Sequence, residues 1–184
     1  ACFVDYDRDG RLDLFVVNYV EFCPAKRCRD RAGREDFCGP QAFPGTTSRL
    51  WRNVSADGAI RFEDVTLASG IGHTPGPGLG VVCADVDGDH WPDLFVAKDG
   101  RRNRLYVNQR DGTFKDEAVT RGLAFNGMGE TEADMGVAVG DVNGDGLFDL
   151  FVTHLVSETH TLWRQGPRGQ FMDGSVRAKV AASH

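Results

Sequence analysis

The sequence predicts an all-β fold, on the strength of three observations. A short acidic phrase occurs three times, beginning at Asp5, Asp85 and Asp141, and each copy is followed by the apolar tripeptide Leu-Phe-Val. These β-branched and aromatic runs favour strands, whereas helical periodicity is weak throughout the chain. Three copies of one phrase within 184 residues also indicate a repeat protein.

Two further phrases recur after each acidic loop, and both carry an aromatic residue. The aromatic positions are Trp51, Tyr106 and Trp163 in one phrase, and Phe62, Phe114 and Phe171 in the other. Each unit therefore reads strand, acidic loop, strand, strand, turn, strand. Four short strands with Gly-rich turns are typical of a β-propeller blade. We predict a propeller segment of about three four-stranded blades, with the aromatic side chains packed between adjacent blades and partial exposure allowed for those of the third strands.

The predicted domain is a single propeller segment covering residues 1–184, with repeats at about 1–66, 79–120 and 135–176. The first repeat contains an insertion at 18–48, about 25 residues that the other two lack. Three blades do not close a propeller, and a blade without a neighbour leaves an apolar face in water. We therefore expect either a segment of a longer protein or an assembly of several copies.

The acidic loops predict about three bound Ca²⁺ ions. They place oxygen side chains at positions 1, 3, 5 and 9, the donor type that Ca²⁺ prefers. Position 7 has no side-chain oxygen, so its backbone carbonyl is assigned as the ligand. The predicted ligand positions are Asp5, Asp7, Asp9, Arg11, Asp13, Asp85, Asp87, Asp89, Trp91, Asp93, Asp141, Asn143, Asp145, Leu147 and Asp149. The alternative is that these Asp-Gly clusters are ordinary turns.

The loops are not EF-hands. An EF-hand requires a bidentate Glu at position 12 and a helix on each side. Position 12 is a valine in all three copies, and strand-like sequence follows. Position 6 is Gly10, His90 or Gly146, which suits a left-handed backbone best where it is glycine. His tolerates that conformation better than bulky residues do.

These phrases together resemble the FG-GAP/VCBS repeats of integrin α-subunit propellers. They resemble more closely the family of proteins related to cartilage acidic protein, which often end in an ASPIC/UnbV domain. The resemblance is carried by Phe37-Cys-Gly-Pro40, by GVVCADVDGDHWPDLFVA, and by Asp134–Val139 ahead of GDVNGDGLFDLFVTH. It implies a calcium-bearing propeller. No ASPIC/UnbV sequence is visible here, so none of that domain's properties is inferred.

Charge and cysteine content limit the function further. The formal net charge of −6 would be offset by three Ca²⁺ ions, and the basic residues at 26–34 lack a nucleic-acid-binding motif. No membrane-spanning run is visible. In an oxidising compartment a Cys28–Cys38 disulfide would close the insertion. Cys2 and Cys83 are interpreted as small buried apolar residues, and the partner of Cys23 is left open.

Three elaborated connections predict where a partner binds. They are residues 18–48, 72–78 and 126–134. In an up-and-down sheet these connections leave on the face opposite the acidic loops, and elaborated loops on a rigid scaffold commonly carry binding. We therefore expect an extracellular, cell-surface or periplasmic binding or adhesion module for a protein or glycan ligand, with possible self-association. Arginines at 27, 29, 31 and 34 favour an anionic ligand.

An enzyme is not expected, because no nucleophile elbow, Walker loop or His-Glu-x-x-His motif occurs. His73, His154 and His160 are scattered along the chain and are interpreted as surface or packing residues. The acidic group of Glu130, Glu132 and Asp134 is either a solvated loop or a fourth cation site. Two alternatives stay open: an accessory or partial domain of a secreted hydrolytic enzyme, and a self-assembling surface or filament component.

Overall fold

The computed structural model describes residues 1–155 and 158–181, and three four-stranded antiparallel sheets dominate it. The first sheet has the order β1 (Cys2–Val4), β2 (Asp13–Val16), β5 (Arg49–Asn53) and β6 (Phe62–Asp64). The second comprises β7 (Gly78–Ala84), β8 (Asp93–Lys98), β9 (Arg104–Asn108) and β10 (Phe114–Asp116). The third comprises β11 (Val137–Gly140), β12 (Asp149–Val152), β13 (Thr161–Gly166) and β14 (Gln170–Asp173). The all-β prediction is therefore confirmed.

The remaining elements are small. They are the hairpin β3 (Cys28–Arg29) and β4 (Glu35–Asp36), the short helices α1 (Ala118–Arg121) and α2 (Ser175–Ala178), and the 3₁₀ turns η1 (Pro40–Ala42), η2 (Ile71–His73) and η3 (Pro167–Gly169). The helices follow the fourth strands of the second and third sheets. Each acidic loop joins the first strand of a sheet to its second, which agrees with the rejection of EF-hands.

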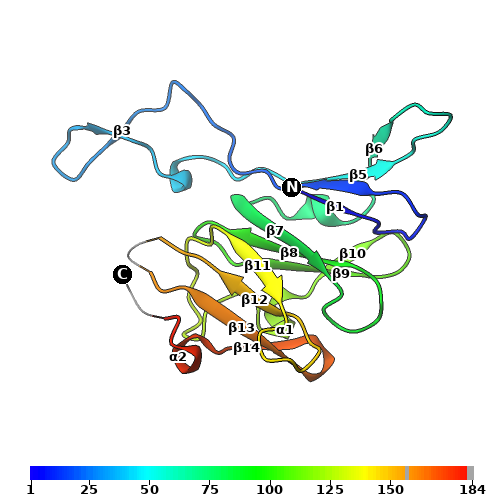
Figure 1. Ribbon diagram of the computed structural model, residues 1–184. Coiled ribbons are helices and arrows are strands. Elements are labelled where there is room, and N and C mark those ends of the chain that lie inside the picture. The colour runs from blue at the N-terminus through cyan, green and yellow to red at the C-terminus, as the bar shows by residue number, and fades with distance from the viewer. Residues whose placement is uncertain (156–157, 182–184) are drawn as a thin grey trace.

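The second sheet lies between the other two (Figure 1), and its strand β8 is buried on both faces. Side chains alternate across a strand with a period of two. On β8, Leu94 and Val96 accordingly join the core shared with the first sheet, while Phe95 and Ala97 join the core shared with the third. This sandwiched position explains why the apolar run of β8 is continuous.

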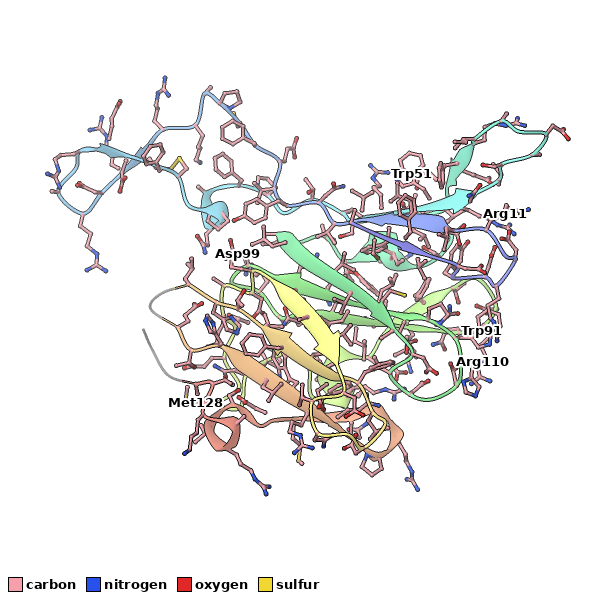
Figure 2. All side chains as sticks on the ribbon, viewed as in Figure 1. Arg11, Trp51, Trp91, Asp99, Arg110 and Met128 are labelled. Atoms are coloured by element: carbon pink, nitrogen blue, oxygen red, sulfur yellow. A yellow bond between two sulfur atoms is a disulfide. The ribbon has the colours of Figure 1, made fainter. Side chains whose placement is uncertain are left out.

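The recurring aromatic residues pack between sheets where a neighbouring sheet exists. Phe114 lies 5.8 Å from Tyr6 of the first sheet's loop, and Trp163 lies 6.0 Å from Phe95, measured between ring centroids. Trp51 occupies the equivalent position in the first sheet and is only half-buried (Figure 2). Its face of the sheet carries no further sheet among the described residues. The packing prediction therefore does not extend to Trp51.

The insertion in the first sheet extends away from the stacked sheets as a hairpin (Figure 1). The Cys28–Cys38 disulfide closes it, with the two Cα atoms 5.2 Å apart, so that predicted bond is confirmed. Cys2 and Cys83 are free and half-buried against the core between the first and second sheets, and Cys23 is free and exposed. One end of the stack therefore carries a disulfide-closed arm.

Candidate functional site

All three acidic loops adopt the same turn. The first aspartate of each accepts hydrogen bonds from backbone N–H groups at positions 5 and 6. The N–H groups of Gly10, His90 and Gly146 lie 3.1, 2.8 and 2.8 Å from Asp5, Asp85 and Asp141. The residue at position 6 has a positive φ in every copy, at 87°, 68° and 83°. His90 thus adopts the left-handed backbone that glycine adopts in the other two loops.

The aspartate at position 9 is the buried anchor of each loop. Asp13, Asp93 and Asp149 are each at most 1 % exposed. One carboxylate oxygen accepts the N–H of position 2, at 3.0–3.2 Å. The other accepts an N–H at the end of the third strand, at 2.7–2.9 Å. Burial raises the pKa of Asp93 to about 7 and also raises the pKa of Asp13.

Two of the loops gather three carboxylates around one point. The aspartates at positions 1, 3 and 9 each offer an oxygen within 4.8 Å of the others. These groups are Asp5, Asp7 and Asp13 in the first loop, and Asp85, Asp87 and Asp93 in the second. The third loop has Asn143 at position 3, and its amide donates to Asp145 at 2.7 Å. The third loop therefore offers one negative charge fewer than the other two.

Arginine side chains neutralise part of the negative charge of the acidic loops, and the sequence did not predict these contacts. Arg52 contacts Asp7 at 2.8 Å, Arg110 contacts Asp89 at 2.7 Å, and Arg121 contacts Asp87 at 3.0 Å. The other oxygen of Asp87, Oδ1, is buried without a hydrogen-bond partner. Asp9 and Asp89 at position 5 are thus held by guanidinium groups, through Arg11 and Arg110 respectively.

The residues at position 7 contribute backbone N–H groups in the structure. Arg11, Trp91 and Leu147 each donate to the carboxylate at position 5, at 2.9, 2.7 and 2.9 Å. The bond fixes the turn ahead of the second strand. Ligation through the carbonyls of these residues stays a prediction.

At the other end of the sheets the elaborated connections contact one another. Gly76 donates to the carbonyl of Thr46 at 3.0 Å, which joins the 72–78 loop to the insertion. Gly100 donates to the carbonyl of Glu132 at 2.9 Å, which joins the β8–β9 turn to the 126–134 loop. We call this end the opposite face, defined by residues 18–48, 72–78, 99–103 and 126–134. In Figure 1 it lies at the left, with the acidic loops at the right and below.

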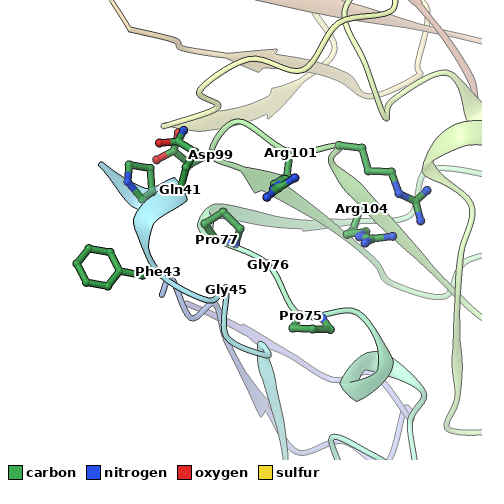
Figure 3. A pocket seen from close by; sticks show the side chains of 11 residues that line it. Gln41, Phe43, Gly45, Pro75, Gly76, Pro77, Asp99, Arg101 and Arg104 are labelled. Atoms are coloured by element: carbon green, nitrogen blue, oxygen red, sulfur yellow. The ribbon is translucent and has the colours of Figure 1, made fainter. Parts of the chain in front are cut away.

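A cavity of about 390 Å³ lies on the opposite face (Figure 3). Three segments line it. The lining residues are Pro40, Gln41, Phe43, Gly45, Pro75, Gly76, Pro77, Asp99, Arg101, Arg102 and Arg104. The wall is closely packed, because a Cβ atom added to Gly45 would lie 2.5 Å from the Cα of Gly76. Asp99 accepts a hydrogen bond from the Tyr19 hydroxyl of the insertion.

The charge of this cavity comes from arginines other than those of the insertion. Arg102 and Arg104 share Asp116, at 3.3 and 2.6 Å, while Arg101 is exposed. In the hairpin, by contrast, Arg34 pairs with Asp30 at 2.7 Å. Arg101 and Arg102 lie on the β8–β9 connection, and Arg104 is the first residue of β9. This connection is too short to have stood out as elaborated in the sequence.

A second cluster on the opposite face centres on His154, which is buried, as one of the two predicted alternatives has it. Its Nδ1 lies 2.9 Å from Asp134, and its Nε2 lies 3.1 Å from the Thr161 hydroxyl and 3.6 Å from Glu132. Glu130 is exposed and stays outside the cluster. The position of His154 in the sequence could have predicted this cluster. The residue follows the second strand of the third sheet and therefore emerges beside the 126–134 loop.

The order carboxylate, imidazole, hydroxyl in this cluster is that of a nucleophilic triad. Thr161, however, is 2 % exposed, and its hydroxyl donates to Glu132 at 3.2 Å. A substrate carbonyl could not reach a buried hydroxyl whose proton is already held by another acceptor. The arrangement therefore does not favour catalysis.

Comparison with known proteins places residues 85–152 within the family model described as FG-GAP-like repeat. The chain is 28 % identical to cartilage acidic protein 1 of Mus musculus over 156 residues, covering 82 % of this chain and 20 % of that protein. The Homo sapiens and Xenopus tropicalis proteins of the same name are 27 % and 26 % identical, over 82 % and 97 % of this chain and 19 % and 24 % of theirs. The resemblance seen in the sequence is confirmed.

The chain spans about a fifth of the length of the curated relatives that it matches. Within residues 1–155 and 158–181, no helix has the length and apolar character needed to cross a membrane.

Proposed function

We propose that this chain, which carries an FG-GAP-like repeat and is similar to cartilage acidic protein 1, is a calcium-stabilised propeller segment that acts as a binding or adhesion module. The observation that carries the proposal is the hydrogen-bonded turn that all three acidic loops share at one end of the sheets. In this reading the three four-stranded sheets are blades. Each of about three Ca²⁺ ions fixes the entrance to the second strand of its blade.

The donor set fits calcium. All the side chains gathered in the first two loops are carboxylates, which suit a hard cation that takes six to eight oxygens. The buried Oδ1 of Asp87 has no hydrogen-bond partner and is available as a ligand. The third loop, with Asn143 in place of an aspartate, is expected to bind most weakly. The role of the ion is structural, because it would hold like charges together that repel one another without it.

The ligand-binding surface is the opposite face. Its loops contact one another around the cavity, which Arg101, Arg102 and Arg104 line. Arg102 and Arg104 share the one carboxylate of Asp116, and Arg101 is exposed to a ligand. Guanidinium groups recognise carboxylate, sulfate and phosphate groups through paired hydrogen bonds. A protein or glycan ligand that presents an acidic group is therefore favoured. The Cys28–Cys38 disulfide of the insertion supports an extracellular, cell-surface or periplasmic location.

Self-assembly is a second candidate function, and the half-buried Trp51 favours it. The equivalent residue in the third sheet, Trp163, is 1 % exposed because the second sheet covers it. A further blade against Trp51, from a second copy or from additional sequence, would complete the same packing. The accessory-domain alternative has no comparable support in the geometry.

Calorimetric titration with CaCl₂ and elemental analysis test the calcium proposal. We expect about three ions per chain, and about two after Asp85→Asn. Asp57→Asn, at an exposed turn outside the loops, is the matched control and should leave the number unchanged. Equal calcium contents in all three proteins, or none in the wild type, would contradict the proposal.

Binding of the protein to an immobilised acidic polysaccharide and to polyglutamate tests whether the opposite face recognises acidic ligands. Arg101→Ala should weaken binding, whereas Arg31→Ala, at the tip of the hairpin, should not. Deletion of residues 24–37 removes the hairpin. Loss of binding at an unchanged Tm would indicate recognition by the hairpin, whereas retained binding would indicate recognition by the cavity. If the Arg31 and Arg101 variants behave alike, the cavity is not the site.

A further inference from the structure

Three donor atoms around His154 form a nearly equilateral triangle. The distances are 3.1 Å from His154 Nε2 to Thr161 Oγ1, 3.2 Å from Thr161 Oγ1 to Glu132 Oε2, and 3.6 Å from Glu132 Oε2 to His154 Nε2. A metal ion bound to nitrogen and oxygen at about 2.0–2.1 Å holds neighbouring ligands about 3.0–3.4 Å apart. The three atoms therefore already have nearly the separations of three ligands on one ion.

Asp134 supplies the outer partner that metal-binding histidines usually have. Its Oδ1 lies 2.9 Å from Nδ1, on the side of the ring away from the triangle. A carboxylate in this position keeps the proton on Nδ1 and leaves the Nε2 lone pair for a metal. The two atoms are buried, yet neither makes a well-aligned hydrogen bond. A small rotation of the imidazole toward an ion at Nε2 could improve that alignment.

The cluster is rich in negative charge and poor in positive charge. The side chains of His154 and Asp134 are 0 % and 4 % exposed, and that of Glu132 is 12 % exposed. Across the described part of the chain, no lysine or arginine forms an ion pair with Glu132 or Asp134. Glu158 adds a third carboxylate, which accepts the backbone N–H of Ala133 at 2.9 Å. Three carboxylates therefore lie around one buried imidazole.

A hydrogen-bonded relay from Asp134 through His154 and Thr161 to Glu132 is the alternative explanation. It accounts for the short distances without an ion. It does not account for the unaligned Nδ1 and Oδ1 atoms or for the excess of carboxylate charge. A divalent cation at the triangle would account for both.

We propose that His154, Glu132 and Thr161 bind a divalent transition-metal ion, with Asp134 positioning the imidazole. Imidazole combined with carboxylate suits Zn²⁺ and its neighbours in the first transition series, whereas Ca²⁺ prefers oxygen ligands alone. The ion would tie the 126–134 loop to the start of β13, at the opposite end of the sheets from the acidic loops. It would stiffen that part of the opposite face. This site is independent of the calcium loops and of any acidic ligand.

The test is calorimetric titration of ZnCl₂ into the full chain in the presence of excess CaCl₂, which occupies the acidic loops. We expect one Zn²⁺ per chain in the wild type and at least a tenfold loss of affinity in His154→Gln. His73→Gln, at an exposed histidine, is the matched control and should bind as the wild type does. Asp85→Asn should lose calcium and keep zinc, which separates the two kinds of site.

Substitution of Co²⁺ for Zn²⁺ gives a second readout that does not depend on folding of the His154 variant. A visible absorption band in the wild type, lost in Glu132→Gln at unchanged circular dichroism, would support ligation by this cluster. The proposal is overturned if wild-type protein binds no Zn²⁺ or Co²⁺ beside calcium. It is also overturned if His154→Gln or Glu132→Gln binds the ion as tightly as the wild type does.

Discussion

The side-chain amide of Asn108 donates a hydrogen bond to the backbone carbonyl of Tyr6, 2.8 Å away, and so joins the second sheet to the acidic loop of the first. Gln165 makes the corresponding bond from the third sheet to the carbonyl of Val86, at 2.7 Å. Both bonds are buried. In the second and third sheets, a side-chain amide near the end of the third strand thus fastens the sheet to the acidic loop of the preceding sheet.

Asn108→Ala is expected to lower the free energy of unfolding by about 1–3 kcal/mol, because it leaves the buried Tyr6 carbonyl without a partner. Asn53 is the matched control, since its amide donates to Leu12 of its own loop, at 2.9 Å and in an exposed setting. Asn53→Ala should cost less than about 1 kcal/mol. Denaturant unfolding of the two variants measures both values, and equal losses would contradict a role in joining sheets.

Trp163 and Trp51 allow a second matched comparison, because they occupy one repeat position in different surroundings. Trp163→Ala removes a fully buried side chain between two sheets and should cost about 3–5 kcal/mol. Trp51→Ala should cost much less in a monomer, because the side chain is half-exposed. A large loss at Trp51, together with a molar mass above that of one chain by light scattering, would instead indicate that copies associate through this face.

Calcium removal should destabilise the whole stack, because each acidic loop supports a buried second strand. An ion bound only by the folded state contributes about 2.7 kcal/mol per site at a hundredfold excess over Kd. Chelation should therefore lower Tm, and added CaCl₂ should restore it. If elemental analysis shows that the ions have left while Tm is unchanged, the calcium has no structural role.

Much of the fold follows from local pattern, and the reason is the repeat. A single Leu-Phe-Val run is an ambiguous indication of a strand. Three copies beside the same acidic phrase, however, indicate the order of strands within each sheet. The Cys28–Cys38 bond could also be predicted, because its cysteines lie in one loop. What the repeat could not reveal is which sheet faces lack a neighbour, and hence that Trp51 differs from Trp163.

The candidate sites also differ in how far the sequence could predict them. Residues of an acidic loop lie within nine positions of one another, so their proximity is readable from spacing. The cluster of His154 with Glu132 and Asp134, and the pairing of Arg121 with Asp87, join segments from different sheets or loops. Such contacts depend on how the sheets stack and how their connections emerge. The topological argument about which end each connection leaves could have suggested the His154 cluster, but not the pairing of Arg121 with an acidic loop.

Lys98 gives a final prediction, on pH. It is 1 % exposed, and its ammonium group donates to the carbonyl of Gly76 at 3.2 Å. Burial, reinforced by the charge of Arg104 and opposed by that of Asp116, lowers the pKa of Lys98 to about 8. Below that pH the folded and unfolded states both bind the proton, and the folded state bears the full desolvation penalty of a buried charge.

Between pH 8 and the ordinary lysine pKa of 10.5, the unfolded state holds a proton that the folded state has released. Stability contributed by this residue should therefore rise with pH across that window, by up to about 1.4 kcal/mol per pH unit. Lys98→Met should remove this rise and should be more stable than the wild type at pH 7. The difference between the two proteins in denaturant unfolding from pH 7 to 10.5 isolates the effect from other titrating groups. Parallel pH profiles would show that the Lys98 pKa is not lowered in the folded state.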